Sequence, residues 1–276
     1  MSPSLKKLEE GLAEYYGWAI TPDARSNLSA AVVCKAGRLG ICQDEYCEIA
    51  ATSQSEMLAL VEQAAVGETG FFRESDQFEF LKTVIVPGLD TPSAKCDPVR
   101  VWSSACSTGE EPYSLAIAFQ QSVSQGKERS VEIFATDVRN GALLVASQAR
   151  YESPGLSGIE SSVRNRYFVP CPNSKDERGA TQFSLVPEVR RLVTFRRVNL
   201  LEQIFWRSLA GRFDLIVCTN LLVLLHSVAI RRMVGRLAHS LKLGGFLMVA
   251  PTEAVFVNHP HLRALENAPA FFSRVE

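Results

Sequence analysis

The residues of this chain most suited to binding a charged ligand gather in one stretch, A-C-S-T-G-E-E-P-Y-S, at positions 105–114. It follows an apolar segment, residues 99–104, and leads into a predicted helix with apolar Leu115, Ala116 and Phe119. Small side chains let a ligand approach the backbone closely. A strand that turns over small residues into a helix is how open α/β folds build their first cofactor-binding loop. The stretch therefore predicts such a loop.

Two adjacent glutamates, Glu110 and Glu111, stand at the start of this helix. Thr108 and Glu111 have the spacing of a capping box, in which side chains satisfy the first N–H groups of a helix. Pro112 is tolerated in a first turn. On this interpretation one glutamate caps the helix and leaves the other to face a ligand.

Asp137 closes the next predicted strand, residues 130–137. In nucleotide-cofactor folds an acidic side chain there accepts hydrogen bonds from ribose hydroxyls. The alternative is a helix N-cap, a position where Asp is favoured; we favour the ribose interpretation. A dehydrogenase would need G-x-G-x-x-G, of which Gly109 alone is present. A methyl donor carries no pyrophosphate and tolerates a sparser loop, so the loop favours a methyltransferase.

Arg73 and Asn220 are two further candidates. Arg73 follows Phe71-Phe72, and a guanidinium held by aromatic residues suits a carboxylate of the donor or the acceptor. The alternative is a surface arginine beside two core phenylalanines. Asn220 ends a predicted strand, residues 213–220, where class I methyltransferases place acceptor-facing residues. It is followed by Leu221-Leu222 and not by a Pro-Pro-aromatic run, which disfavours methylation of nucleobases.

Strands and helices alternate along most of the chain, and this predicts an α/β fold with a doubly wound, mostly parallel sheet. A helix around Met233 and Leu237 is expected to end at Gly244-Gly245. Between residues 151 and 191 the alternation fails, and two short strands there predict a small antiparallel insertion. The predicted strands of the main sheet are residues 99–104, 130–137, 192–198, 213–220 and 246–250, with an edge strand at 271–275.

The first part of the chain, residues 1–68, reads as a separate helical domain. One helix carries Leu5 to Tyr16, a second runs from Thr21-Pro22 to a stop at Gly37, and a third begins at Ser53. With five basic and ten acidic residues, this domain has a net charge of −5. Residues 69–276 form the predicted cofactor-binding domain, with the insertion at about 152–191.

Bulk composition excludes several classes. The 276 residues have a net charge of −1, which argues against a general nucleic-acid binder. Seven scattered cysteines without a C-x-x-C pair indicate reduced thiols in a cytoplasm. No apolar run approaches the roughly 18 residues of a membrane helix. No metal site is expected, because His259 and His261 lack further ligands at suitable spacing.

The stretch at 105–114 resembles the signature of the CheR family, the chemotaxis-receptor glutamate methyltransferases that use S-adenosylmethionine. Other segments are similar to the family's motifs from about residue 67 to Glu253. They are T-G-F-F-R at 69–73, A-T-D at 135–137, N-L-L at 199–201, F-D-L-I-V-C-T-N at 213–220 and L-G-G-F-L at 243–247.

The resemblance implies a class I methyltransferase fold, Rossmann-like, with an N-terminal helical domain and an inserted β-subdomain that begins at Tyr151. It implies S-adenosyl-L-methionine as cofactor and S-adenosyl-L-homocysteine as product. Arg73 would be catalytic as well as cofactor-binding. The implied cofactor-binding residues are Thr69, Arg73, Glu110, Asp137, Asn199, Leu200, Thr219 and Asn220.

The implied function is methyl transfer to glutamate carboxylates of the cytoplasmic helical domain of a methyl-accepting receptor. A carboxylate with an ordinary pKa near ~4.3 is already a nucleophile at neutral pH, so no strong base is needed. We expect a cytoplasmic monomer that binds no nucleic acid and does not insert into membranes. Two alternatives stay open: a methyltransferase of another acceptor class (a small molecule or nitrogen), and a cofactor-binding regulator with weak or no turnover.

The chain departs from the family's pattern at four places. Gly67 stands where the family usually has Asn, and Thr219 where it has Arg. Leu224 occupies the position of a tyrosine thought to sit near the transferred methyl group. The N-terminal segment is acidic, whereas a basic one often docks receptor helices. These changes suit a divergent member serving a signalling array other than the flagellar one.

Overall fold

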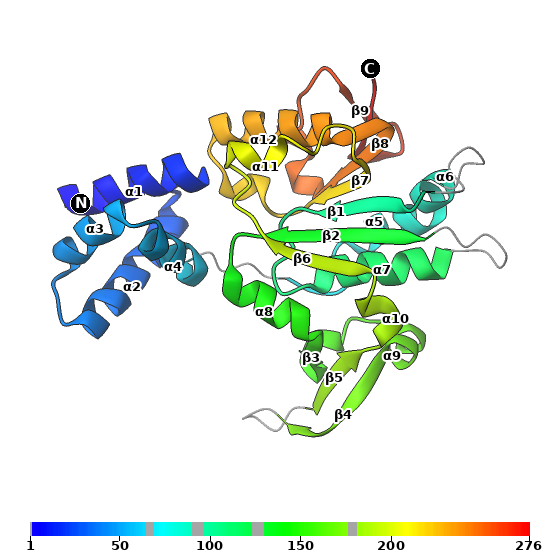
Figure 1. The fold of residues 1–276 in the computed structure, drawn as a ribbon, viewed down its shortest axis with the longest axis horizontal. Helices are drawn as coiled ribbons and strands as arrows, with labels where there is room; N and C mark the ends of the chain where they lie inside the picture. Colours follow the sequence, from blue (N-terminus) through cyan, green and yellow to red (C-terminus); the bar gives the residue numbers. More distant parts are fainter. Residues whose placement is uncertain (1, 65–68, 90–96, 123–129, 176–180) are drawn as a thin grey trace.

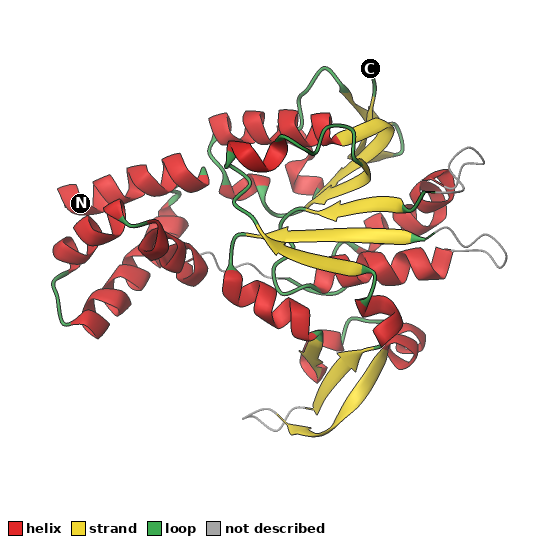
Figure 2. Cartoon of the chain, viewed as in Figure 1, coloured by secondary structure: helices red, strands yellow, loops and turns green. Residues whose placement is uncertain are grey.

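The computed structural model describes residues 2–64, 69–89, 97–122, 130–175 and 181–276. A seven-stranded sheet with helices on both faces forms the body of the molecule (Figure 1). A bundle of helices built from the N-terminal part lies at one end, and a three-stranded sheet projects from the body (Figure 2). The fold is therefore the predicted α/β class.

The central sheet has the strand order β6-β2-β1-β7-β8-β10-β9. The first five strands in this order are parallel to one another, whereas β10 runs antiparallel to both β8 and β9. Of these strands, only β9 was not predicted. The bounds are β1 Val99–Ser103, β2 Val131–Asp137, β6 Val193–Arg197, β7 Phe213–Cys218, β8 Leu241–Val249, β9 Leu262–Leu265 and β10 Ala268–Arg274.

Alternation along the strands divides the sheet into two apolar faces, because successive side chains point to opposite sides. Val101 and Ile133 belong to the core beneath helix α7 (Glu110–Ser122). Trp102 belongs to the other core, with the side chains of helix α12 (Ser227–Ser240). The strand β7 is buried along its whole length, as expected of a central parallel strand covered on both faces.

Helix α12 ends earlier than the sequence predicts. Its last residue is Ser240, and Leu241 already begins strand β8, where it is paired with Phe213 of β7. The predicted end at Gly244-Gly245 was wrong. The apolar Leu241 fits the helical period as well as the strand, and only its pairing with the neighbouring strand decides between the two.

Four helices form the N-terminal bundle around a core of their own that includes Leu8, Leu28 and Leu60. The second ends at Gly40 and not at Gly37, since Gly40 has the left-handed backbone (φ 69°) of a helix C-cap. The helix predicted to begin at Ser53 is α4, and α3 before it was not predicted. The domain boundary predicted at residue 68 lies outside the described residues. The helices are α1 Pro3–Tyr16, α2 Pro22–Leu39, α3 Gln43–Thr52 and α4 Gln54–Ala64.

The insertion between β2 and β6 contains a three-stranded antiparallel sheet in the order β3-β5-β4. The two strands predicted there, at residues 166–170 and 182–186, correspond to β4 and β5, although residues up to Tyr167 form a short helix before β4; strand β3 was not predicted. The elements are α8 Asn140–Gln148, β3 Arg150–Glu152, η3 Ser153–Leu156, α9 Ser161–Tyr167, β4 Phe168–Lys175, β5 Thr181–Leu185 and α10 Pro187–Arg190.

The remaining helices are short. They are α5 Ser75–Phe80, the π-helix η1 Leu81–Ile85, α6 Val86–Leu89, α11 Gln203–Trp206, η4 Leu222–Leu224 and η5 Pro251–Phe256. Among the residues that the structure describes, no helix combines the length and the apolar character needed to cross a bilayer.

Candidate active site

A cavity opens at the carboxyl ends of β1, β2 and β7, where open α/β sheets bind their ligands. The loop between β1 and α7 forms one side of it, and the residues that follow β7 form another. Three residues of the N-terminal part complete the wall: Tyr16 at the end of α1, Trp18 just after it and Val61 of α4. Sequence reasoning placed the whole site after residue 68, so this contribution was missed.

The loop after β1 is closely packed against the rest of the protein. Ser107 and Gly109 both have positive φ, at 49° and 97°. A Cβ on Gly109 would lie 2.9 Å from Ala146 Cβ and 2.9 Å from Tyr151 Oη, so only glycine fits without displacement. The Ser107 N–H donates to Asp137 Oδ2 at 2.8 Å, which ties the loop to the end of β2.

Asp137 is buried beside this loop, with 7% of its surface exposed. Its other oxygen, Oδ1, accepts from the Arg139 N–H at 2.9 Å and from Arg139 Nε at 3.3 Å. The N-cap of α8 is Arg139, so Asp137 is not the cap that the alternative interpretation required. A carboxylate has about four lone-pair sites, and these three hydrogen bonds leave about one that can accept from a ligand in the cavity. The ribose role stays a prediction.

The two adjacent glutamates have different surroundings. Glu111 lines the cavity, and its carboxylate accepts from Ser103 Oγ at 2.6 Å and from the Thr219 hydroxyl. Glu110 is not among the lining residues; it accepts from Thr108 Oγ1 at 2.7 Å and from Thr69 Oγ1 at 3.3 Å. The predicted capping box is therefore not formed.

Burial raises the pKa of Glu111 to about 7, even though the hydroxyls of Ser103 and Thr219 oppose the shift. The nearby carboxylate of Glu253 raises it further. Thr219 stands where the family usually has arginine, so no guanidinium at that position offsets the charge of Glu111. The result is a carboxyl group in the cavity wall whose pKa lies well above that of an ordinary glutamate.

The turn after β7 is organised by Glu253, which is fully buried. Its carboxylate accepts from the backbone N–H groups of Asn220 at 2.7 Å, Val223 at 3.1 Å and Ala250 at 3.2 Å. Asn220 has a positive φ of 58°, a conformation that asparagine tolerates better than most residues. Its presence there therefore has a backbone reason as well as any contact with a ligand.

Asn199 and Leu200 line the cavity on the side of β6 and the N-terminal bundle. The side chain of Asn199 donates from Nδ2 to the Tyr15 carbonyl at 3.0 Å and accepts from the Leu201 N–H at 2.9 Å. It joins the end of helix α1 to the cavity wall. Leu200 is buried there with 8% of its surface exposed.

Thr69, Arg73 and Leu224 line the remaining side. Phe71 packs edge-on against Tyr151, with ring centroids 4.8 Å apart, so the aromatic pair before Arg73 supplies a core residue as the alternative interpretation held. Arg73 itself is exposed and borders the cavity, so a contact between its guanidinium and a bound ligand, as the predicted role requires, is sterically possible. Leu224 is 41% exposed and adds apolar surface there.

The structure thus gathers seven of the eight candidate residues on one cavity. They are Thr69, Arg73, Asp137, Asn199, Leu200, Thr219 and Asn220. Glu110 lies just outside, while Glu111 and Arg139 were not among the candidates. The pairing of Glu111 with Thr219 joins the start of α7 to the end of β7, so no local pattern in the sequence could have revealed it.

A mostly parallel sheet of this order, with a small-residue loop and an acidic side chain at the next strand end, is the fold of class I methyltransferases. Comparison with known proteins is more specific. Residues 67–271 match the model of the CheR methyltransferase family, SAM binding domain. The chain is 30% identical over 221 residues to chemotaxis protein methyltransferase 1 of Pseudomonas aeruginosa, covering 79% of this chain and 77% of that protein.

Two further relatives agree. The chemotaxis protein methyltransferase of Listeria innocua is 32% identical and covers 72% of this chain, which spans 69% of that protein. Chemotaxis protein methyltransferase 1 of Vibrio cholerae is also 32% identical, covering 72% of this chain and 68% of that protein. The chain belongs to the CheR methyltransferase family, and S-adenosylmethionine is its cofactor.

Proposed function

We propose that this protein transfers a methyl group from S-adenosylmethionine to glutamate side-chain carboxylates of a methyl-accepting, chemotaxis-type receptor. The observation that carries the proposal is that the described lining of the cavity offers no unengaged strong base: Glu111, whose pKa is raised to about 7, already accepts hydrogen bonds from Ser103 and Thr219 on its two carboxylate oxygens. None of its described lining residues is a histidine. Burial raises the pKa of Tyr16 to about 12 and that of Cys106 well above its ordinary value, so both stay protonated at neutral pH.

A carboxylate acceptor suits such a site. It is ionised at neutral pH without help, because its ordinary pKa is near ~4.3. An amine or an alcohol must lose a proton and would need a base within hydrogen-bond reach. Catalysis of carboxylate methylation then depends mainly on holding the acceptor in line with the methyl group.

The cofactor, when bound, supplies the electrophilic methyl group. Asp137 and the loop around Ser107 would hold the donor, and Arg73 would orient the acceptor carboxylate, since a guanidinium can donate two parallel hydrogen bonds to it. Leu224 and Trp18 border the same cavity and would exclude water from it. Glu111 has both oxygens engaged by hydroxyl groups and is assigned no proton transfer.

The acceptor would be the cytoplasmic helical domain of the receptor, and the protein would act in the cytoplasm. Support comes from the relatives, which are named chemotaxis protein methyltransferases. The exposed position of Arg73 at the cavity edge also fits an acceptor that arrives from outside on a large partner.

Thr219 and Leu224 favour one second candidate, a cofactor-binding regulator with weak turnover. Each replaces a residue that the family's pattern places near the reacting groups, and Thr219 is engaged with Glu111.

The type of bond formed tests these candidates. Incubation with methyl-labelled S-adenosylmethionine and receptor-containing membranes should label protein, and mild alkali should release the label as volatile methanol. The label should map to glutamates on exposed helix faces. Alkali-stable label would refute carboxyl methylation and indicate nitrogen as acceptor. No labelling with the native receptor present would favour the regulator.

A further inference from the structure

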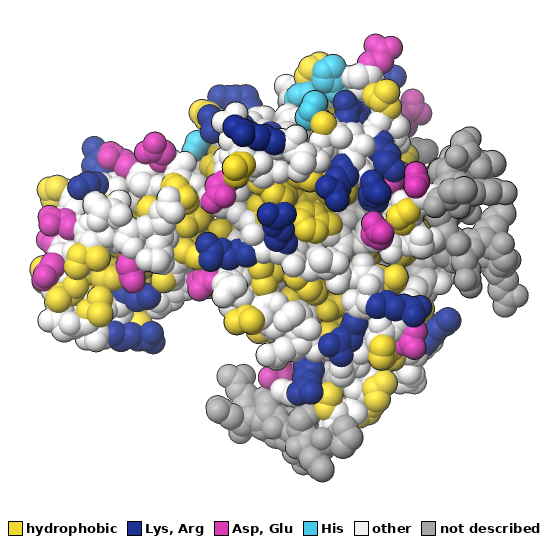
Figure 3. All heavy atoms as spheres, viewed as in Figure 1, with side chains coloured by type: hydrophobic (Ala, Val, Ile, Leu, Met, Phe, Trp, Pro, Cys, Tyr) yellow, Lys and Arg dark blue, Asp and Glu magenta, His cyan; other side chains and the backbone are white. Residues whose placement is uncertain are grey.

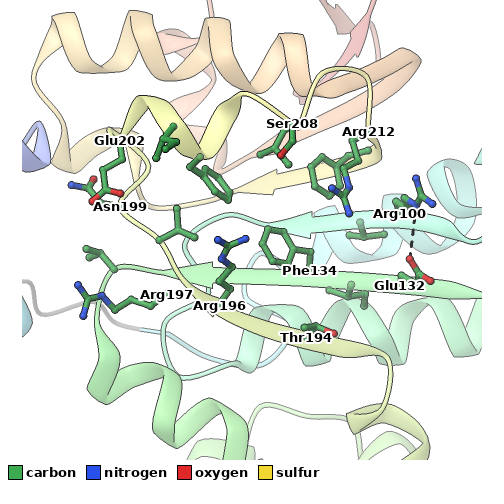
Figure 4. Close-up of a pocket in the computed structure, with 18 of the residues that line it drawn as sticks. Arg100, Glu132, Phe134, Thr194, Arg196, Arg197, Asn199, Glu202, Ser208 and Arg212 are labelled. Atoms are coloured by element: carbon green, nitrogen blue, oxygen red, sulfur yellow. Dashed lines mark ion pairs between the residues drawn. The ribbon is translucent and has the colours of Figure 1, made fainter.

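The central sheet is incompletely covered on the face that carries α12. Parallel sheets are normally buried on both faces, and the connection between β6 and β7 would usually supply a covering helix. Here that connection contains only the four-residue helix α11. Strands β1, β2 and β6 consequently border an open groove of about 1100 Å³ (Figure 4).

The floor of this groove is apolar and aromatic. The ring of Phe134 lies parallel to that of Phe213, at a centroid distance of 6.3 Å and an angle of 7°. Phe205 is stacked on Phe134 at the same distance, with an angle of 28°. At the edge, Ile204 has 70% of its surface exposed, although its neighbour Trp206 is buried. An isoleucine this exposed beside a half-covered sheet is surface that a partner could bury.

Arginines surround this floor. Five of them line the groove against two glutamates, Glu132 and Glu202. Among the described residues, Arg100 is the one of the five in an ion pair, with Glu132 at 3.8 Å. Figure 3 shows Lys and Arg side chains placed around a hydrophobic centre on this face. The arginines are Arg100, Arg191, Arg196, Arg197 and Arg212.

We propose that this groove binds an acidic amphipathic helix of a partner protein. Strand β2 has seven residues, which at roughly 3.3 Å each gives a length near 23 Å. A helix of about 15 residues spans the same distance at 1.5 Å per residue. Its apolar face would cover Phe134 and Ile204, and its carboxylates would reach Arg196, Arg197 and Arg212.

The charge and shape distinguish this occupant from others. The surplus of three positive charges is spread along the rim, with Arg197 toward one end and Arg100 and Arg212 toward the other (Figure 4). A single phosphate group would need converging donors. A long nucleic acid would prefer a groove with a polar floor and a larger basic excess. Spread charge over an apolar floor matches a helix with one apolar and one acidic face.

This docking site adjoins the cofactor cavity, and four residues border both: Tyr16, Val138, Val198 and Asn199. The residues that would bind the helix, such as Arg196, Ile204 and Arg212, line the groove and not the cavity. The proposal therefore does not depend on which acceptor is methylated. The test measures peptide binding and not methyl transfer. A negative result would therefore contradict the docking site and leave the proposed methyl transfer unaffected.

The test uses the full chain and a fluorescent, helix-forming peptide of about 15 residues with leucines on one face and glutamates on the other. Two probes of the same length serve as controls: one with lysine for glutamate, and one with the same composition in scrambled order. Fluorescence anisotropy should show that the acidic amphipathic probe binds and that neither control probe does. Increasing salt should weaken it, since exposed charges are screened.

Two variants and a control locate the site. Arg196→Glu combined with Arg212→Glu should weaken binding of the acidic probe at least about tenfold, because like charges now face each other. Ile204→Ser should weaken it through loss of apolar contact. Arg263→Glu reverses an exposed arginine on β9, outside the groove, and should leave binding unchanged. Calorimetry with S-adenosylhomocysteine would show that each variant is folded.

Four outcomes would overturn the proposal. The first is that the acidic probe does not bind at about 0.5 mM, a concentration at which even weak recognition is visible. The second is that the scrambled or the lysine probe binds equally well, and the third is that Arg263→Glu is the one variant that loses binding. The fourth is that a single-stranded oligonucleotide binds more tightly than the peptide and depends on the same arginines. A dimer seen by sedimentation that Arg196→Glu dissociates would also overturn it. In that case the acidic N-terminal bundle of a second copy would be the occupant.

Discussion

Replacing Glu111 by glutamine offers the sharpest test of how the cofactor cavity is built. The glutamine side chain has nearly the same shape and can keep hydrogen bonds to Ser103 and Thr219, but it cannot be charged. Burial raises the pKa of Glu111 to about 7 from the ordinary 4.5. The folded protein therefore holds this proton more tightly than the unfolded chain.

The sign of the effect follows from that difference. The protonated carboxyl contributes its full stabilisation below about pH 4.5, and this contribution is lost as pH rises through about 7. Each pH unit of the gap is worth about 1.4 kcal/mol. The loss is at most about 3 kcal/mol, since Glu111 is only partly buried in the cavity wall and solvent screens part of the effect. The variant lacks this titration.

The assay is urea unfolding of the native protein and the Glu111→Gln variant at several pH values. The free energy of unfolding of the native protein, minus that of the variant, should fall by up to about 3 kcal/mol between pH 4.5 and pH 8. Other titratable groups are common to both proteins, so their contributions largely cancel. Glu110→Gln is the matched control, because it removes a carboxylate from the preceding helix position outside the cavity.

Two results would refute this reasoning. A pH-independent difference would mean that Glu111 is not held in the protonated form, and an equal effect in Glu110→Gln would assign it to charge at the start of α7. Thr219→Arg introduces the arginine that the family's pattern has at this position. It should lower the pKa of Glu111, because a guanidinium beside the carboxylate favours its charged form, and the stability difference should then be lost at lower pH.

Asp137→Ala should weaken binding of S-adenosylmethionine and of its demethylated product by about 1–3 kcal/mol, the scale of hydrogen bonds to a charged group; unchanged affinity by calorimetry in a folded variant would remove the ribose assignment. Arg73→Ala should abolish methyl transfer while the variant stays folded, because Arg73 is exposed; near-normal turnover in the labelling assay would make Arg73 a bystander. Gly109→Ala should lower the free energy of unfolding by about 2–4 kcal/mol, through backbone strain and the contact with Tyr151. Gly141→Ala, at an exposed helix position with nothing within 4 Å, is its control and should change stability little in thermal melts.

Most of the fold could be predicted from the sequence, because the residue patterns that specify strands and helices are local. Alternating apolar residues specify β2 and the buried run specifies β7, whatever lies elsewhere in the chain. The small-residue loop before α7 requires glycine at position 109, because Ala146 and Tyr151 leave no room for a Cβ there, so this glycine in the sequence indicates a close approach of neighbouring groups. The central strands could therefore be predicted, while the exact ends of α2 and α12 could not. Those ends depend on a left-handed cap at Gly40 and on strand pairing of Leu241.

The family and the cofactor class could be predicted from sequence motifs, and seven of the eight candidate residues lie on the cavity, because motifs at strand ends meet at one edge of a parallel sheet. Which of Glu110 and Glu111 faces the cavity was decided only by tertiary structure, since neighbouring residues of a helix point about 100° apart and either could be turned inward. The closure of the cavity by Tyr16 and Trp18 was likewise invisible, because it joins segments far apart in the chain. The open groove over Phe134 arises from a helix that is too short to cover the sheet, and only the assembled fold reveals what that helix leaves exposed.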